Sequence, residues 1–559
     1  MDGSYFKRHK GRHLRKYFKE YCENTTIHGF RYLAEKRSIV EKIFWIILIL
    51  SSIGVCSYLI NRIYEKYRTS PVIVSFATKE SPIFTIPFPA VTICPVTKAS
   101  SSMINFTEVY YKKVDNETVD PIEYVTKDEL YAQYMLLLCD LNPARFPKNE
   151  TFSDEFFEVI DKASDPISLP QFAVTAGCKF MGKARSCYQL FTRIILDEGV
   201  CYTFNMLNRE EIFQNDVIYS LLSMFYDNFH HNGLESKWNR DNGYSDNAQR
   251  DTYPRRALFA GADNALSIAF YHYENDTDYV CANNEVQGYR ILLHTPDTIP
   301  LLKKQYFQVP FDQGVLAAVQ PKMMTTSSGV KNFPAEDRDC YLSDEKPLDY
   351  FQIYTPGNCK LECLTNYTLK RCKCVNFYMP RKNSTPICGN GKFRCMRQAE
   401  MKLKSLQLKT FGQSDKDNQD YCDCKPLCTE LSYDVELSQT ELKLQETLRA
   451  YRVKGHKHIA ENIIKENYFS VRFSTLTIFF KLEQFLTSQR NELYGPTDFL
   501  ANFGGLLGLF TGFSLLSLME LIYFFTLRIF CNTRRYRVWS GPLEEAKPSD
   551  FQEGQRKVQ

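Results

Sequence analysis

The residues best suited to chemistry lie in an apolar stretch near the C-terminus, residues 499–527, which carries one charge. Gly512, Phe513 and Ser514 stand in its middle, and Glu520 is the charged residue. Glycine allows extended backbone, which a membrane tolerates only against protein or a water-filled lumen. Exposed carbonyls and the Ser514 hydroxyl could replace part of a small cation's hydration shell, and a carboxylate further in would favour cations. These residue types and their spacing predict a cation-selecting site.

A series of glycines precedes this site. Gly504, Gly508 and Gly512 recur every four residues, which forms a small-residue face that lets helices approach closely. Taken alone, the series indicates a packing or dimerisation motif equally well. Glu520 favours the pore interpretation, because a carboxylate in a membrane is costly and normally faces a bundle interior or water. A structural hydrogen bond between helices is the alternative role for Glu520.

Two membrane spans must position these residues. Residues 43–60 form a second uncharged stretch, and about 20 apolar residues cross a bilayer. The stretch follows a long basic segment, so it starts too late for a cleaved signal peptide. A mean hydropathy of −0.35 leaves most of the 559 residues outside the membrane. Two spans place both ends of the chain on the same side.

The charge distribution identifies that side. Residues 1–42 hold 11 Lys and Arg against 5 Asp and Glu, and residues 528–559 hold 7 against 4. Positive tails next to membrane spans favour the cytosol. We therefore expect a plasma-membrane protein with cytosolic tails at 1–42 and 528–559, spans at 43–60 and 499–527, and an extracellular domain at 61–498.

The cysteines agree with this topology. Of 19 cysteines, Cys22, Cys56 and Cys531 fall in the tails and the first span, and the other sixteen lie in the outer segment. An even number on the oxidising side predicts eight disulfides, whose pairing the sequence leaves open. The candidates are Cys94, Cys139, Cys178, Cys187, Cys201, Cys281, Cys340, Cys359, Cys363, Cys372, Cys374, Cys388, Cys395, Cys422, Cys424 and Cys428.

Metal binding and catalysis have little support in the pattern. The C-x-C pairs could ligate zinc, but an extracellular location favours disulfides. The sequence shows no nucleophile–base pair, no phosphate-binding loop and no cluster of His and Glu. His294 lies in a strand-like run and is expected to be a structural residue. We therefore expect neither an enzyme nor a cofactor or metal site.

Asn-x-Ser/Thr sequons give weaker support to the topology. Six lie in the outer segment and are candidate glycosylation sites, whereas Asn24 lies in the expected cytosol and should stay unmodified. The six are Asn105, Asn116, Asn149, Asn275, Asn366 and Asn383.

The outer segment is expected to have a β core with helical additions. Runs rich in β-branched and aromatic residues predict strands at 88–94, 199–205, 288–296 and 470–482. Residues 120–165 are predicted to be helical and acidic, and residues 340–428 to form a disulfide ladder. Residues 434–465 are predicted to form a charged amphipathic helix. The fold class is thus a two-span membrane protein with a disulfide-rich α/β extracellular domain.

With these motifs in view, the chain resembles the degenerin/epithelial sodium channel family, and within it the insect pickpocket branch. The likeness covers nearly the whole chain. It rests on His28-Gly29, on FPAVTIC at 88–94 and GVCYTFN at 199–205, on the cysteine blocks at 358–374 and 422–428, and on GGLLGLFTGFSLLSLMEL at 504–521.

The resemblance implies a trimeric channel with a hand-like extracellular domain, each second helix lining a central pore. It implies a voltage-independent, sodium-preferring current blocked by amiloride. Gly512, Phe513 and Ser514 fall on the family's selectivity filter, His28 and Gly29 on its cytosolic gating motif, and Glu520 on an acidic position below the filter. Ala501 falls on the small-residue gate position, next to Gly504, Gly505 and Gly508.

Two departures from the family pattern bear on function. Phe513 is bulkier than the Ala or Ser of many relatives, which puts fine selectivity in doubt, and the C-terminal tail lacks a Pro-Pro-x-Tyr motif. The resemblance implies sodium ions, homologous subunits and the bilayer as partners, with no nucleic acid, and an extracellular chemical or mechanical stimulus. The alternatives are a non-conducting accessory subunit and a two-span, scavenger-receptor-like lipid-binding protein, in which the spans would be mere anchors.

Overall fold

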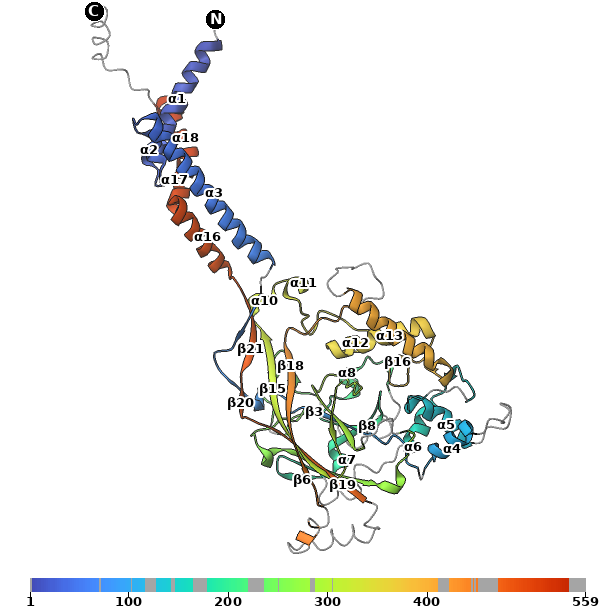
Figure 1. The fold of residues 1–559 in the computed structure, drawn as a ribbon. Helices are drawn as coiled ribbons and strands as arrows, with labels where there is room; N and C mark the ends of the chain where they lie inside the picture. Colours follow the sequence, from blue (N-terminus) through green and yellow to red (C-terminus); the bar gives the residue numbers. More distant parts are fainter. Residues whose placement is uncertain are drawn as a thin grey trace, which may run out of the picture. The chain divides into compact units, whose positions relative to one another are not determined.

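The computed structural model describes residues 3–69, 72–101, 103–115, 127–141, 146–163, 178–219, 236–249, 251–281, 287–303, 305–410, 422–443, 446, 449–450 and 471–541. Two compact units make up the chain (Figure 1). Unit 1 combines Met1–Ile73 with Glu492–Gln559, and unit 2 is Val74–Asn491.

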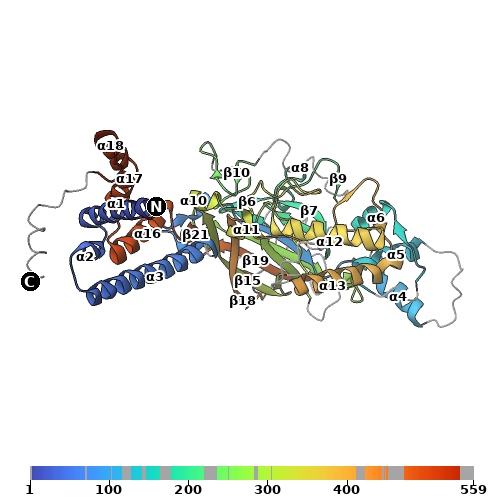
Figure 2. The same cartoon turned by 90° about the horizontal axis from the view of Figure 1, so that it is seen from above.

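Unit 1 is helical. Its elements are α1 (Gly3–Asn24), α2 (Phe30–Ala34), α3 (Ile39–Thr69), α16 (Pro496–Thr511), α17 (Leu515–Phe525) and α18 (Leu527–Tyr536). α3 and α16 pack side by side (Figures 1 and 2). Ile39–Thr69 and Leu515–Tyr536 are long and apolar enough to cross a membrane.

The first of these helices extends beyond the apolar stretch at 43–60. It starts earlier because Ser38 caps it: the Glu41 N–H donates to Ser38 Oγ over 3.3 Å, and Ser38 Oγ donates to the Glu41 carboxylate over 2.9 Å. The membrane boundaries at 43–60 and 499–527 remain predictions.

The second apolar stretch is a broken helix. α16 ends at Thr511 and α17 begins at Leu515, so residues 512–514 form a break in the middle of the stretch. The physical reason is Gly512, whose φ of 69° ends α16 in the left-handed region that glycine adopts at little cost.

Two sheets form the framework of unit 2. The larger, eight-stranded sheet has the order β1 (Val72–Phe76), β21 (Thr487–Glu492), β15 (Gln313–Thr326), β19 (Val471–Phe480), β12 (Leu266–Tyr273), β5 (Cys178–Phe180) and β6 (Lys183–Arg185), with β18 (Glu430–Glu441) also paired to β15. The five-stranded sheet has the order β14 (Phe307–Val309), β13 (Tyr289–His294), β3 (Ala90–Pro95), β8 (Gly199–Phe204) and β7 (Phe191–Leu196).

Short two-stranded ladders complete the β structure of the described residues. They pair β10 (Trp238–Asn239) with β11 (Gly243–Tyr244), β16 (Arg381–Lys382) with β9 (Val217–Ile218), β17 (Ile387–Cys388) with β4 (Thr151–Phe152), and β2 (Ser81–Pro82) with β20 (Gln484–Phe485).

One hydrophobic core lies between the two sheets. Alternate residues of β12, β15 and β19 meet those of β3, β8 and β13 there. Phe88 is fully buried and lies at its centre, with ring centroids 5.4 Å from Phe180 and Phe480 and 6.1 Å from Phe204. Burial of such aromatic side chains is a large favourable contribution to folding.

A second core joins the five longest described helices of unit 2. These are α4 (Phe106–Asp115), α5 (Lys127–Leu138), α6 (Glu155–Ala163), α12 (Pro356–Cys372) and α13 (Phe393–Thr410). α12 and α13 lie side by side in Figures 1 and 2.

All sixteen outer cysteines are paired, in eight disulfides. The pairs are Cys94–Cys201, Cys139–Cys281, Cys178–Cys187, Cys340–Cys428, Cys359–Cys424, Cys363–Cys422, Cys372–Cys395 and Cys374–Cys388. Cys22, Cys56 and Cys531 are free thiols. The disulfide ladder predicted at 340–428 ties α12 and α13 to their surroundings.

The helix predicted at 434–465 is wrong over its first part, because residues 430–441 form β18. The physical reason is a period of two: Leu431 and Tyr433 are buried, whereas the intervening Ser432 and Asp434 are exposed. β18 pairs with β15 along twelve residues, so its backbone hydrogen bonds are satisfied between strands. Residues 451–465 lie outside the described residues.

The turn between β7 and β8 contributes two carboxylates to a buried cluster of charged side chains. Asp197 and Glu198 are about 5% and 4% exposed. Glu198 pairs with Lys98 at 3.4 Å and with Arg290 at 2.7 Å, and Lys98 Nζ donates to the Leu138 carbonyl over 3.0 Å. Burial lowers the pKa of Lys98, against the opposite influence of Glu198. The cluster joins the hairpin to α5 and β13.

Candidate functional site

The break at residues 512–514 is the centre of the candidate site. The Gly512 N–H donates to the Gly508 carbonyl over 2.9 Å, and the Phe513 N–H reaches the Leu507 carbonyl over 3.4 Å. Ser514 is extended, with φ −119° and ψ 173°. Within the described part of the chain, no hydrogen bond uses the carbonyl oxygens of Gly512 and Phe513. Two successive carbonyls are therefore available to a ligand such as a cation.

Ser514 starts the second half of the broken helix. Its hydroxyl accepts a hydrogen bond from the Ser517 N–H over 3.3 Å, while Ser517 Oγ accepts from the Ser514 N–H over 3.1 Å. This reciprocal cap fixes the direction in which α17 leaves the break. The Ser514 side chain thus has a structural role as well as an oxygen atom for a ligand.

The N-terminal motif His28-Gly29 packs directly against the break. The His28 N–H donates to the Thr511 carbonyl over 2.9 Å. A Cβ on Gly512 would lie 2.7 Å from the His28 ring, and one on Gly29, which has φ 87°, would lie 2.9 Å from Ile49. Only glycine fits both positions without displacing its neighbours. Two motifs that the sequence places almost 500 residues apart therefore form one site.

Helix α3 packs against this site. Ser52 Oγ donates to the Phe510 carbonyl over 2.5 Å, which occupies a carbonyl of the last turn of α16. A small cavity of about 90 Å³ lies between α3, the N-terminal loop and the end of α16, lined by His28, Trp45 and Thr511 among others. Tyr32 in α2 stacks on Trp45 with ring centroids 4.1 Å apart. These contacts hold the loop and the break together.

Glu520 contacts the same N-terminal segment. Its Oε2 accepts from the Thr26 N–H over 3.0 Å, from Thr26 Oγ1 over 3.2 Å and from Thr25 Oγ1 over 3.4 Å. Thr26 Oγ1 also lies 2.7 Å from the hydroxyl of buried Ser517. The side chain is half-buried. The carboxylate therefore anchors the N-terminal segment to α17, in agreement with the structural alternative for Glu520.

The outer half of α16 presents its small residues openly. Ala501 is exposed, and no atom of another described element lies within 4 Å of a Cβ built on Gly504, Gly505 or Gly508. Unlike Gly512, these three glycines are therefore not covered by side chains of the described subunit. Such a face is suited to close approach by helices of other subunits.

Sequence reasoning missed Thr25, Thr26 and Ser52. Each acts through a hydrogen bond to a residue more than 450 positions away. Their hydroxyl groups were the one available indication in the sequence, because Ser and Thr in or beside an apolar span need a hydrogen-bond partner. The sequence contains no local indication of which partner it is.

His294 is a buried structural residue. One ring nitrogen lies 2.8 Å from Thr92 Oγ1 and the other 2.9 Å from the Thr295 carbonyl. Burial lowers the pKa of His294 to about 4. The imidazole therefore stays neutral at physiological pH and joins β3 to β13.

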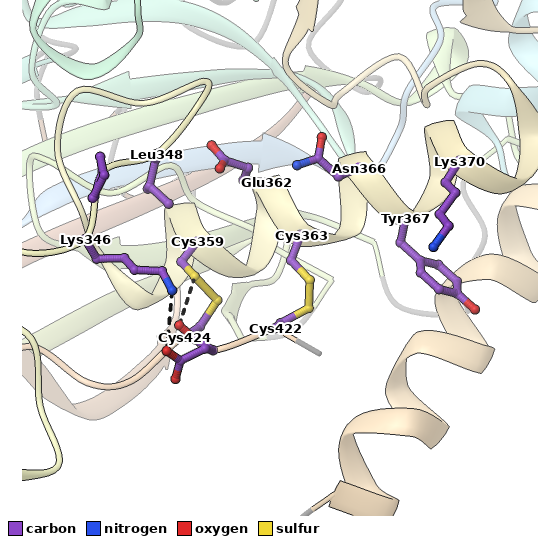
Figure 3. A pocket seen from close by; sticks show the side chains of 12 residues that line it. Lys346, Leu348, Cys359, Glu362, Cys363, Asn366, Tyr367, Lys370, Cys422 and Cys424 are labelled. Atoms are coloured by element: carbon purple, nitrogen blue, oxygen red, sulfur yellow. Dashed lines mark hydrogen bonds and ion pairs between the residues drawn. A yellow bond between two sulfur atoms is a disulfide. The ribbon is translucent and has the colours of Figure 1, made fainter. Parts of the chain in front are cut away.

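A second hollow lies on unit 2 beside α12. It has a volume of about 370 Å³, and the disulfides Cys359–Cys424 and Cys363–Cys422 form part of its wall (Figure 3). Lys346 crosses it to Asp423 at 3.4 Å. Asn366, a candidate glycosylation site, also lines it and is exposed.

The other sequons differ in exposure. Asn105, Asn275 and Asn383 are exposed, whereas Asn149 is half-buried and donates to Gln133 over 2.7 Å. Asn116 lies outside the described residues.

Comparison with known proteins places the chain among ion channels. The family model described as amiloride-sensitive sodium channel matches residues 21–524. Pickpocket protein 28 of Drosophila melanogaster is 26% identical over 524 residues, which cover 92% of this chain and 79% of the relative. The bile acid-sensitive ion channel of Homo sapiens is 22% identical, over 92% of this chain and 86% of the relative. Acid-sensing ion channel 1 of Gallus gallus is 22% identical, over 90% and 82%.

Proposed function

The chain belongs to the amiloride-sensitive sodium channel family, and from that premise we propose that residues 512–514 select sodium ions in its pore. As a member of this family, the chain is a subunit of a trimeric cation channel and not an enzyme. It lies in the plasma membrane with two spans and both termini in the cytosol. Its partners in the trimer are identical or homologous subunits.

The observation that carries the proposal is the pair of free carbonyls at the break. In a trimer, the carbonyl oxygens of Gly512 and Phe513 form two rings of three around the axis, and Ser514 adds hydroxyls. Such rings replace water around a cation and repel anions. Because these oxygens belong to the backbone, they are present whatever side chain residue 513 carries. The proposal therefore holds for Phe513 as well as for the smaller residues found at this position in many relatives.

The His28-Gly29 motif would control the width of these rings. The His28 N–H holds the Thr511 carbonyl, and the His28 ring fills the space beside Gly512. A shift of the N-terminal segment therefore changes the backbone at the break directly. Glu520 contributes negative charge below the rings and anchors the same segment through Thr26.

The current is expected to be voltage-independent and blocked by amiloride, with gating by an extracellular chemical or mechanical stimulus. The spans carry no array of charged residues that would sense voltage: residues 43–60 hold none and residues 499–527 hold Glu520 alone. The large extracellular domain is the part that a stimulus outside the cell can reach.

The test is whole-cell recording of Gly512→Ala and Ser514→Ala, with surface biotinylation of each variant. We expect a sodium/potassium permeability ratio lowered about tenfold, a loss of about 1.4 kcal/mol in discrimination, or loss of current at normal surface density. A methyl group on residue 512 would lie 2.7 Å from the His28 ring and displace the backbone at the break, and Ser514→Ala removes a hydroxyl that can bind the ion. Matched controls are Gly54→Ala and Ser51→Ala, which lie exposed on α3, and these should leave the ratio unchanged.

Two outcomes would count against the proposal. An unchanged permeability ratio in both filter variants would place the filter elsewhere. Current that appears only when a related subunit is co-expressed, and that keeps its selectivity in both variants, would make the chain an accessory subunit.

A further inference from the structure

The N-terminal helix α1 lies along the cytosolic half of the broken second span. The Tyr17 hydroxyl donates to the Phe524 carbonyl, and the Tyr21 and Phe524 ring centroids are 5.4 Å apart. Glu20 forms an ion pair with Arg528. Cys22 is fully buried, although its helix lies in the cytosolic tail. These contacts join α1 to both α17 and α18.

The chain after α18 turns back onto these helices. Arg537 adopts φ 55° at the end of α18, and residues 537–541 form what we call the C-terminal turn. Asn532 Nδ2 donates to the Trp539 carbonyl over 3.2 Å, and the Trp539 ring meets the Tyr17 ring edge-on at 5.5 Å. Ser540 is 1% exposed.

The Ser540 hydroxyl closes the contact between the turn and α1. Its Oγ lies 2.5 Å from Nδ1 of His13. A hydroxyl this deeply placed has no room for a larger group while α1 is docked. The two ends of the chain therefore meet at one buried side chain on the cytosolic side of the membrane.

The sequence before Ser540 is Arg535-Tyr536-Arg537-Val538-Trp539. Arginines five and three residues before a serine are the pattern that basophilic serine/threonine kinases recognise, because acidic side chains in the kinase cleft pair with both guanidinium groups. Nothing in the pore geometry requires these two arginines. The serine that they precede is also the one that contacts α1.

We propose that Ser540 is a phosphorylation site of basophilic cytosolic kinases, and that its modification releases α1 from the second span. In the reaction, Ser540 Oγ attacks the γ-phosphorus of ATP and loses its proton. The bond from the γ-phosphorus to the bridging oxygen breaks, and ADP leaves. The product is a serine phosphate monoester, and no oxidant or metal change is involved.

The direction of the effect follows from burial and charge. A phosphate adds about −1.5 to −2 charges and three oxygens that need hydration or cations. The position beside His13, Asn532 and Trp539 is closed to water, so the docked turn cannot hold it. A kinase binds its substrate as an open segment and so modifies the undocked form. Once modified, that form is retained, which shifts the equilibrium away from docking.

Release of α1 would reach the pore through the chain that follows it. α1 ends at Asn24, and the next residues are Thr25 and Thr26, which bind Glu520. His28, which holds the Thr511 carbonyl, comes two residues later. Phosphorylation at one end of the chain would thereby loosen the support of the 512–514 break.

The first experiment asks where phosphate is added. Purified full-length channel is incubated with ATP and the catalytic subunit of a basophilic kinase, and phosphopeptides are mapped by mass spectrometry. We expect phosphate on Ser540, no signal at that peptide in Ser540→Ala, and at least about tenfold less in the double variant Arg535→Ala, Arg537→Ala, whose arginines make the charge-assisted contacts to the kinase. Absence of phosphate from Ser540 in the intact protein would overturn the assignment.

The second experiment measures docking through the reactivity of Cys22. Cys531 is replaced by serine, because it is the exposed free thiol, whereas Cys56 is buried in the first span. Burial raises the pKa of the Cys22 thiol to about 11, so its alkylation by a maleimide is slow while α1 is docked. We expect alkylation to become about tenfold faster in Ser540→Glu and in the phosphorylated protein, and to stay slow in Ser540→Ala.

A charge-free control separates release from local damage. His13→Ala removes the same hydrogen bond as Ser540→Ala without adding charge, and should likewise leave alkylation slow. Equal alkylation rates for Ser540→Ala, Ser540→Glu and phosphorylated channel would overturn the release of α1, as would slower alkylation after phosphorylation. Neither measurement depends on ion current, so a wrong assignment of the filter leaves this test intact.

Discussion

Ser514 and Glu520 make structural contacts at the break in addition to the roles that we propose for them in ion permeation. Ser514 caps α17 through Ser517, and Glu520 binds the backbone of Thr26. A substitution that removes a side chain therefore mixes two effects, loss of structure and loss of an ionic ligand. Substitutions that keep shape and change charge are the ones that separate these effects.

Glu520→Gln is such a substitution. The amide keeps an oxygen that can accept from Thr26, so the N-terminal segment should stay docked while the charge is lost. We expect intact trimers and a single-channel conductance about threefold lower at low ionic strength. The difference in conductance should shrink at high salt, because mobile ions screen the charge of the three Glu520 carboxylates. Single-channel recording across salt concentrations and native gel electrophoresis provide the measurements.

Glu520→Ala is the comparison variant, because it removes the hydrogen bonds as well as the charge. If Glu520→Gln conducts like the wild type at every salt concentration while Glu520→Ala loses trimers, the carboxylate is structural and plays no part in permeation.

Strands were the elements most readily predicted from sequence. The runs at 199–205, 288–296 and 470–482 contain β8, β13 and β19, and the run at 88–94 covers all of β3 except its last residue. In each, β-branched and aromatic residues are bounded by residues that disfavour helix, such as Pro87 and Pro89. Local pattern and tertiary context agree there.

β18 was mistaken for a helix because its exposed face is strongly charged. Asp434, Glu436 and Glu441 suggest a solvated helix, but only the buried Leu431 and Tyr433 report the period of two. The contacts of Thr25 and Thr26 with Glu520 could not be predicted from the sequence for another reason. Thr26 and Glu520 are 494 positions apart, and no local pattern encodes a contact at that separation.

The β7–β8 hairpin gives a prediction at the scale of an element. Glu198→Gln leaves the buried cations Lys98 and Arg290 without their shared carboxylate. Breaking a buried ionic cluster on one side typically costs 3–5 kcal/mol, here taken as about 3 kcal/mol or more. We expect a lower melting temperature of the purified channel and reduced surface density, measured by thermal denaturation and biotinylation.

A matched control lies on the exposed face of the larger sheet. Glu436 pairs with Lys481 at 2.8 Å, and both side chains are largely exposed. Glu436→Gln removes the same charge from a solvated pair, where the expected cost is below about 1 kcal/mol. Equal melting temperatures for the two variants would contradict the importance of the buried cluster.

At the scale of the whole molecule, the topology predicts which sequons carry glycans. Only the outer segment passes through the lumen where glycans are attached. We expect that Asn105→Gln, Asn275→Gln, Asn366→Gln and Asn383→Gln each increase the electrophoretic mobility of the channel, and that enzymatic deglycosylation abolishes the differences. Asn24→Gln should migrate like the wild type, and a glycan on Asn24 would reverse the assigned orientation of the chain.

In a trimer, the open face of α16 can contact the same helix of the neighbouring subunits. A Cβ on Gly504, Gly505 or Gly508 would meet no atom of another described element within 4 Å, and Ala501 is exposed on the outer turns of the same helix. At ~1.5 Å per residue, Ala501 lies about 15 Å along α16 from Thr511. Three such helices converging outside the break would close the pore at their small residues.

Ala501 should therefore be the position where bulk opens the channel. Ala501→Val and Ala501→Phe would clash where three helices meet in the closed state, and the clash is relieved when the helices splay. A cost of ~1.4 kcal/mol confined to the closed state raises the open/closed ratio about tenfold. We expect constitutive, amiloride-sensitive sodium current without a stimulus, recorded at matched surface density.

Leu500→Phe and Asn502→Phe are the neighbouring controls: if these open the channel and the Ala501 variants do not, the register is wrong by one residue. If no bulky substitution from residue 499 to 503 produces current, the closed gate lies elsewhere, because convergence of α16 at this level leaves no space for the added side chains.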